Sequence, residues 1–145
     1  MNSTEQNPFE QTHTLEIRVR YHEIDGQGRV HNSQYLNYFE RGRVEMLRAH
    51  GISYKELEST GLMLVVKTMN IEFHAPALFD DDLLLQTKLE HCHGARIEHH
   101  YRLERPANEQ SQSSLIVTGR SVIACVDRSG RVRRLPPVLQ AGIQS

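Results

Sequence analysis

One long segment with helical periodicity, set among segments that alternate like strands, limits the folds open to this chain of 145 residues. Asn32 or Ser33 can cap the start of this helix with a short polar side chain, and Gly51 marks its end. The residues that recur at helical spacing are Tyr35, Phe39, Gly42, Met46 and Ala49, with Leu36 and Leu47 beside them. A second, short helix is predicted from Ser53 to Ser59. The chain therefore offers one long helix with an apolar face to be covered.

The other segments show the alternation of apolar and polar residues that is typical of half-buried strands. They cover residues 14–21, 62–74, 83–93, 96–104 and 115–126. The predicted apolar face comprises Leu15, Ile17, Val19 and Tyr21 in the first segment and Val65, Met69, Ile71 and Phe73 in the second. Short turns such as Cys92-His93-Gly94 favour antiparallel pairing, and the long helix has to cover one face of the sheet. The sequence thus predicts an α+β fold, with an antiparallel sheet of five to six strands wrapped around one long helix.

Length and charge indicate a single small domain. We expect residues 1–11 to be a flexible N-terminal arm, residues 12–140 to form the domain and residues 141–145 to be a C-terminal tail. Lys and Arg total 17 against 18 Asp and Glu, a net charge of −1 that argues against nucleic acid or an anionic membrane surface as a partner. No apolar run approaches the roughly 20 residues of a membrane span, and the polar N-terminus does not resemble a signal peptide. With 2 cysteines in no disulfide pattern, the chain is expected to be cytoplasmic.

The segment from Tyr21 to Leu36 carries the most specific pattern in the chain. It reads Tyr-His-Glu-Ile-Asp-Gly-Gln-Gly-Arg-Val-His-Asn-Ser-Gln-Tyr-Leu, and it resembles the signature of the 4-hydroxybenzoyl-CoA thioesterase-like hotdog family. Weaker similarities follow in the family's order at residues 39–43, 71–77 and 133–136, so the resemblance extends from about Leu15 to Leu139. It implies a hotdog fold, which is an antiparallel sheet around a central helix, usually joined to a second copy in one continuous sheet. It also implies hydrolysis of acyl-CoA thioesters, with no cofactor.

Asp25 matches the position of the family's catalytic aspartate. Thioester hydrolysis requires a carboxylate that attacks the carbonyl carbon or activates water, and donors that hold the developing oxyanion. The first N–H groups of a helix are unpaired and partially positive, so we expect the donor at the backbone N–H of Asn32 or one residue to either side. Gly28 would let the backbone approach the thioester. Simpler interpretations stay open, because a turn aspartate commonly bonds its own loop and Asn32 can be the helix cap.

Three other residues near this loop are further candidates. Glu23 could be a second carboxylate that raises the pKa of Asp25, or a solvated residue at the strand end, which is the interpretation we favour. Tyr35 could line the substrate pocket, belong to the core, or do both at the edge of a dimer. His31 is expected beside the substrate, directly before the helix.

Charged residues farther along the chain could also take part. Some hotdog thioesterases carry their carboxylate on the helix, where this chain has Glu40 and Glu45. Arg41 lies four residues before Glu45, a spacing that favours a surface salt bridge instead. Cations are needed for the phosphates of CoA, and arginine suits them through its planar set of donors. The candidates are Arg96 and His93 beside the Gly94 turn, and Arg133 and Arg134 near the end of the chain.

Histidine and cysteine are concentrated in two neighbouring predicted strands, at His91, Cys92, His93, His99 and His100. His91 and His93 would share one face of a strand while Cys92 points to the other. Their spacing matches no paired metal motif. We therefore predict surface strand residues near a turn, and no metal.

Three functions are compatible with the sequence. The first is an acyl-CoA thioesterase that acts as a homodimer or homotetramer and binds acyl-CoA but neither nucleic acid nor membrane. The second is a non-catalytic acyl-CoA-binding hotdog module. The third is a hotdog dehydratase or isomerase, which His31 keeps open although no convincing pair of His and Asp accompanies it.

Overall fold

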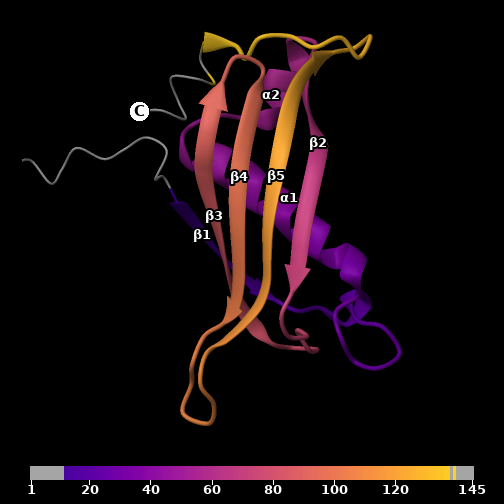
Figure 1. The fold of residues 1–145 in the computed structure, drawn as a ribbon, viewed down its shortest axis with the longest axis vertical. Coiled ribbons are helices and arrows are strands. Elements are labelled where there is room, and N and C mark those ends of the chain that lie inside the picture. The colour runs from indigo at the N-terminus through magenta and orange to yellow at the C-terminus, as the bar shows by residue number, and fades with distance from the viewer. Residues whose placement is uncertain (1–11, 138, 140–145) are drawn as a thin grey trace, which may run out of the picture.

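The computed structural model describes residues 12–137 and 139, and in these residues one antiparallel sheet curves around one long helix (Figure 1). The strands are β1 (Thr12–Arg18), β2 (Leu62–Phe73), β3 (Asp82–His93), β4 (Arg96–Arg105) and β5 (Ser114–Asp127). The helices are α1 (Asn32–Ala49), α2 (Tyr54–Ser59) and a 3₁₀ turn, η2 (Tyr21–Glu23). The described strands lie in the order β1-β3-β4-β5-β2, and every neighbouring pair is antiparallel. The predicted α+β fold is confirmed, with five strands in the described residues.

The predicted boundaries of the domain concern residues that are described only in part. The arm predicted at residues 1–11 and the tail predicted at residues 141–145 lie outside the described residues, so both remain predictions. Across the described residues, no helix is both long and apolar enough to cross a membrane.

The inner strands of the sheet follow the predicted alternation. Their inward-facing residues are buried and include Leu83, Leu85 and Leu89 of β3 and Ile97, Tyr101 and Leu103 of β4. A tight turn joins these strands, with Gly94 at a φ of 62° and His93 paired with Arg96. A left-handed φ of this kind favours glycine, which explains why the predicted hairpin turns here.

The edge strand β2 departs from its predicted pattern. Met69 and Ile71 pack against the core as expected. Val65 and Phe73 were expected on the same face, yet they are 38% and 53% exposed. The difference arises because, among the described strands, β2 has a neighbour on only one side, and α1 packs chiefly against β1 and β3. In a single chain β2 therefore presents an unpaired edge with exposed apolar side chains, a feature that usually marks a pairing surface.

The end of the first predicted strand is also different from expectation. Tyr21 was expected to face the core, but its side chain is 75% exposed. The strand ends at Arg18, and the chain then turns through η2, which carries Glu23 inward in place of Tyr21. Turn formation interrupts the period of two, so the alternation does not extend to Tyr21.

The start of α1 is capped by a residue that the sequence does not suggest. The prediction that Asn32 or Ser33 is the cap is wrong, because Asn32 is already the first helical residue. His31 has an extended backbone and its Nδ1 accepts from the backbone N–H of Ser33 at 3.2 Å. The imidazole nitrogen is thus the N-cap acceptor, a role that a short polar side chain usually has. The predicted end is confirmed, with Gly51 at a φ of 79° directly after the helix.

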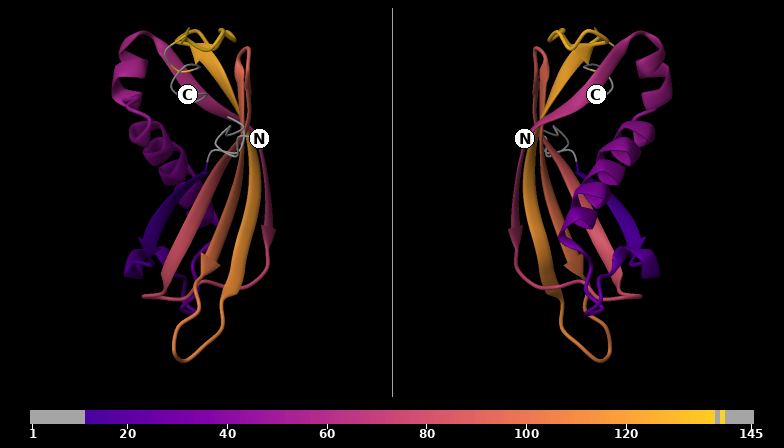
Figure 2. Two further views of the ribbon diagram at one scale, coloured as in Figure 1. Left: turned by 90° about the vertical axis from the view of Figure 1, so that its left-hand side faces the viewer. Right: turned by 90° about the vertical axis from the view of Figure 1, so that its right-hand side faces the viewer.

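One face of α1 packs on the sheet, and it includes the predicted Tyr35, Phe39, Gly42, Met46 and Leu47. Tyr38, which was not predicted, is completely buried. The expectation for Leu36 and Ala49 is wrong, since Leu36 is 42% exposed and Ala49 is also exposed. Leu36 lies beside the buried face. Ala49 is the last residue of the helix, whose C-terminal end diverges from the sheet in Figure 2.

Two glycines allow the helix and the sheet to approach closely. A Cβ at Gly42 of α1 would collide with the side-chain oxygen of Thr87 on β3. A Cβ at Gly119 of β5 would lie 2.6 Å from Cε2 of Phe39 and 3.3 Å from the backbone oxygen of Asn70. These contacts fix the position of α1 on the sheet and therefore the position of the helix ends.

Replacing Gly42 by Ala should destabilise the protein even though alanine is the better helix former. Overpacking of a dense core costs about 1–3 kcal/mol, more than the roughly 1 kcal/mol that alanine gains in a helix. The free energy of unfolding in urea measures this loss. Gly26→Ala is the matched control, because nothing lies within 4 Å of a Cβ built there. Equal stability of Gly42→Ala and wild type would contradict this account of the helix position.

Candidate functional site

A short loop between η2 and α1 holds the predicted catalytic residue. An isolated antiparallel bridge between Ile24 and Val30 closes the loop at its base. Within it, the Asp25 N–H donates to the Arg29 carbonyl at 2.8 Å and the Gly28 N–H donates to the Asp25 carbonyl at 3.1 Å. Gly28 has a φ of 79°, which suits this reversal. In Figure 1 the loop projects at the lower right, below the start of α1.

The Asp25 side chain uses one of its oxygens to order this loop. Oδ1 accepts from the backbone N–H of Gln27 at 2.8 Å and from that of Arg29 at 3.3 Å. Among the described residues Oδ2 has no donor, and the residue is exposed. The simpler interpretation of Asp25 as an aspartate that bonds its own loop is therefore observed. It leaves a second, oriented carboxylate oxygen open to a ligand.

The first turn of α1 lies next to this loop and has one open donor. The Ser33 N–H is taken by His31 Nδ1, and the Gln34 N–H donates to the His31 carbonyl at 2.9 Å. The N–H of Asn32 has no acceptor among the described residues, and Asn32 is exposed. Such an N–H carries the positive end of the helix dipole and can bind an anionic oxygen.

Glu23 fastens the loop to the helix from inside. It is only 7% exposed, and its Oε1 accepts from the Tyr38 hydroxyl and from the Arg20 N–H, each at 2.8 Å. Its carbonyl accepts from the His31 N–H at 2.9 Å. The favoured prediction of a solvated Glu23 is therefore wrong. Burial, followed by the adjacent Glu23 carboxylate, raises the pKa of Tyr38, so the phenol stays protonated and remains a donor.

The segment that follows β2 holds the loop from its other side. Val30 donates its N–H to the Ala77 carbonyl at 2.9 Å, and Phe79 donates to the Gly28 carbonyl at 3.3 Å. Tyr35 is buried, and its hydroxyl accepts from the Ala77 N–H at 3.3 Å. Tyr35 is thus a core residue in the single chain, although its ring touches the exposed ring of Phe73 at 5.7 Å between centroids.

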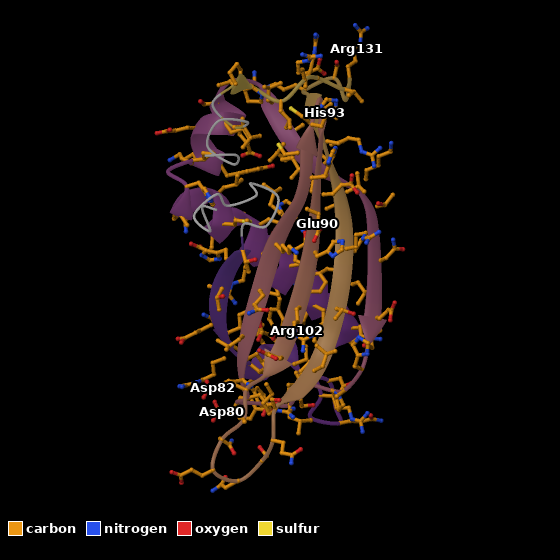
Figure 3. The ribbon with its side chains drawn as sticks, turned by 60° about the vertical axis from the view of Figure 1, so that its left-hand side comes forward. Asp80, Asp82, Glu90, His93, Arg102 and Arg131 are labelled. Carbon is orange, nitrogen blue, oxygen red and sulfur yellow. The ribbon has the colours of Figure 1, made fainter. Side chains whose placement is uncertain are left out.

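The residues predicted to bind the CoA phosphates lie far from Asp25 in the single chain. Figure 3 shows His93 at the opposite end of the molecule from Asp80 and Asp82, which belong to the same end as the loop. Arg96 pairs with His93 across the hairpin, so it shares that distant end. The length of β3 separates the two ends by about 35 Å. One chain therefore brings together Asp25, Gly28, His31 and Asn32, but not Arg96 and His93.

The remaining predicted charges have surface contacts. Glu45 binds Arg48 at 2.5 Å, so the expected pair of Glu45 with Arg41 is wrong. Arg133 binds Asp127 at 2.8 Å, while Arg134 is exposed. Neither pair lies at the loop, and exposed pairs of this kind contribute little to stability.

The histidines divide into two groups. His91 and His93 share a face with their rings 5.9 Å apart, and Cys92 points into the core, as predicted. His99 was predicted on the surface, but it is 7% exposed, and burial together with the nearby Arg43 charge lowers its pKa to about 3. Within residues 12–137 and 139, no three His, Cys, Asp or Glu side chains are placed to hold a metal ion.

The buried pair of Glu23 and Tyr38 was missed because its two members come from separate elements. Tyr38 follows Tyr35 by three residues, so helical spacing could have placed it on the buried face. No sequence signal indicates that Glu23 turns inward to meet it.

Comparisons with known proteins identify the family of this chain. Residues 19–143 match the family described as the thioesterase-like superfamily. The chain is 36% identical over 112 residues to the acyl-CoA thioesterase YbgC of Haemophilus influenzae, covering 77% of this chain and 78% of that protein. It is 32% identical over 111 residues to the acyl-CoA thioester hydrolase YbgC of Escherichia coli O6:H1, covering 77% and 79%. The crystal structure of a probable thioesterase from Bartonella henselae superposes with a TM-score of 0.78 at 33% identity, covering 87% of this chain and 100% of that one.

Tyr38→Phe should destabilise the protein, because it leaves the buried Glu23 carboxylate with one donor fewer. We expect a loss of about 1–3 kcal/mol in the free energy of unfolding, measured in urea. Tyr21→Phe, at an exposed ring, should change stability by less than about 0.5 kcal/mol. If both variants behave alike, Glu23 does not depend on the Tyr38 hydroxyl.

Acidification should destabilise the fold through His99. Its folded pKa of about 3 lies below the ordinary value of 6.5, so in this window the unfolded chain binds a proton that the folded chain excludes, and stability falls as the pH falls. At about 1.4 kcal/mol per pH unit, the loss is roughly 2 kcal/mol over the first one and a half units below the ordinary value. Urea unfolding at neutral pH and at about pH 5 measures this loss. Between these two pH values the free energy of unfolding should fall less in His99→Gln than in wild type. His100→Gln on the outer face is the control, and an unchanged pH dependence in His99→Gln would refute the assignment.

Proposed function

This chain is a thioesterase that belongs to the thioesterase-like superfamily, and on that basis we propose that it hydrolyses an acyl-CoA thioester to the free acid and CoA. In this proposal Asp25 is the catalytic carboxylate, and the N-terminus of α1 forms the oxyanion hole. The observation that carries it is the placement of the free Asp25 oxygen and the open Asn32 N–H at the two ends of one closed loop. A carboxylate and an unpaired helical donor in one place are what thioester hydrolysis requires.

The chemistry follows from these two groups. Asp25 takes a proton from water while the water oxygen bonds to the thioester carbonyl carbon, and the carbonyl oxygen becomes an oxyanion held by the Asn32 N–H. The C–S bond then breaks, and the CoA thiolate takes the proton back from Asp25 to leave as a thiol. Alternatively the Asp25 oxygen bonds to the carbon itself, expels the thiolate and forms an anhydride that water cleaves. Both routes give one acid and one CoA.

The contact between η2 and α1 supports a role for Glu23 and Tyr38 as positioning residues. Their hydrogen bond joins η2 to α1, so it fixes the direction in which Asp25 and the helix terminus face. His31 caps α1 through its Nδ1, and this hydrogen bond orients the first turn of the helix. Gly28 at a positive φ would leave space for the thioester beside the backbone.

We further propose that the active form is a homodimer joined along β2. The unpaired edge of β2 and its exposed Val65, Val66 and Phe73 favour a second strand at this edge. If two copies of β2 pair antiparallel around a two-fold axis, the start of each strand lies beside the end of its partner. The Asp25 loop of one chain would then approach the hairpin end of its partner, which would bring Arg96 and His93 toward the CoA of the neighbouring site.

The release of free thiol from a panel of acyl-CoA substrates tests the reaction. Asp25→Asn should lower kcat/KM by at least about a hundredfold, because the amide cannot accept the proton or act as the nucleophile. Its Oδ1 can still accept from the Gln27 N–H, so the loop and the unfolding free energy should change little.

Matched variants separate this assignment from its rivals. Asp82→Asn removes an exposed carboxylate that binds Arg18 on β1, and it should leave turnover unchanged. Glu40→Gln and Glu45→Gln test the helix carboxylates, which should also be dispensable. Undiminished turnover by Asp25→Asn would assign the chemistry to another group. Binding of acyl-CoA by wild type without any turnover would instead favour a non-catalytic module.

A further inference from the structure

A cavity of about 370 Å³ lies between the C-terminal half of α1, α2 and the sheet. In Figure 2, α1 diverges from the sheet toward α2. Its apolar walls include Met46, Leu47, Leu64, Leu89, Ile97 and Ile123. This volume lies at the lower end of the range of small-molecule sites, about 300–1,000 Å³. Within one chain the cavity is separate from the Asp25 loop, because the completely buried Tyr38 and Phe39 fill the intervening part of the helix–sheet interface.

A half-buried arginine without a carboxylate partner lines this cavity. Arg43 donates through one terminal nitrogen to the Tyr101 hydroxyl at 3.0 Å, and this hydroxyl also meets Ser121 Oγ at 2.5 Å. In the described part of the chain no acidic side chain forms an ion pair with Arg43. A guanidinium has five N–H donors, so most of them remain available. A partly desolvated cation with unused donors favours an anionic acceptor.

Next to Arg43 lies a second unpaired polar group. His99 is 7% exposed and lines the cavity, and its Nδ1 is enclosed without any hydrogen-bond partner among the described residues. Its other ring nitrogen, Nε2, is not enclosed in this way, so Nε2 is the nitrogen that a ligand in the cavity can reach. A neutral imidazole carries one N–H, and with that proton on Nε2 the ring offers a donor to the cavity. Arg43 and His99 therefore offer donors to the cavity that no described residue accepts, and such donors are complementary to an anionic ligand.

We propose that this cavity binds an apolar carboxylic acid, with its carboxylate on Arg43 and His99 and its hydrocarbon body against the apolar walls. An acid of this kind belongs to the class of product that the proposed hydrolysis releases, but the site does not require that reaction. The donors of Arg43 and His99 are complementary to carboxylate oxygens, and the apolar side chains of the walls are complementary to an alkyl chain.

The other polar residues that line the cavity do not compete for the same donors. Glu40 and Glu58 are exposed, so water screens their charges at the mouth. Tyr54 bonds the backbone of Leu64 on β2, accepting from its N–H and donating to its carbonyl, each at 3.1 Å. His50 is bound through Nδ1 to the Met46 carbonyl at 2.8 Å. The unused donors therefore belong to Arg43 and His99.

Isothermal titration calorimetry of the full chain with octanoate tests the proposal. Wild type should bind octanoate, and it should bind acetate and octanamide much more weakly, because one lacks the alkyl body and the other the charge. Arg43→Gln should weaken octanoate binding roughly tenfold to a hundredfold, the effect of losing a hydrogen bond to a charged group. Arg48→Gln is the matched control, since Arg48 is exposed on the same helix and binds Glu45. It should leave the affinity unchanged.

A second measurement places the ligand without any substitution. Met46 lines the cavity, whereas Met69 packs against the separate part of the core that contains Tyr35 and Phe39. In protein labelled with ¹³C at the methionine methyl groups, octanoate should shift the Met46 signal and leave the Met69 signal in place. Binding that leaves Met46 unchanged, equal affinity in Arg43→Gln, or no binding of octanoate would each overturn the proposal. Thiol release from acyl-CoA is measured separately, so failure of this site and failure of the hydrolysis are distinguishable.

Discussion

The close packing of α1 on the sheet is the constraint on which both candidate sites depend. At Gly42 the helix meets β3, and at Gly119 the sheet receives the ring of Phe39, without a Cβ in between. Because protein interiors are densely packed, even one methyl group at these points would have to be accommodated by a shift of the helix. With this contact fixed, the N-terminal end of α1 is held beside the Asp25 loop, while its C-terminal half leaves the sheet and opens the cavity.

A buried carboxylate connects this packing to the loop chemistry. Burying Glu23 is unfavourable unless donors compensate it, and here the Tyr38 hydroxyl and the Arg20 N–H converge on one oxygen. The same residue accepts the N–H of His31 through its carbonyl. One side chain and its backbone therefore hold the turn, the loop and the helix terminus together. This arrangement costs desolvation, and in return it fixes the direction of the groups proposed to bind the thioester.

The two ends of α1 offer donors of different kinds. At the N-terminus the open N–H of Asn32 belongs to the backbone and lies at an exposed surface, where a second chain or a substrate has to complete the site. In the C-terminal half Arg43 lines a largely apolar cavity together with His99 of β4, and the low dielectric there strengthens any bond to an anion. We propose that the Asn32 N–H binds a transient oxyanion, whereas Arg43 and His99 bind a stable carboxylate.

The sequence by itself determined the elements of this protein, because the periods of helix and strand, the turn at Gly94 and the helix stop at Gly51 are local properties. It also placed Asp25 on a loop directly before the helix. Only the tertiary structure decided which polar residues are buried. Glu23 meets Tyr38 across 15 positions and Arg43 meets Tyr101 across 58, and neither spacing follows from local rules. His99 even shares the inward face of β4 with Ile97 and Tyr101, although it was predicted to be a surface residue near a turn. Burial depends on which elements pack together, and that is a property of long-range contacts.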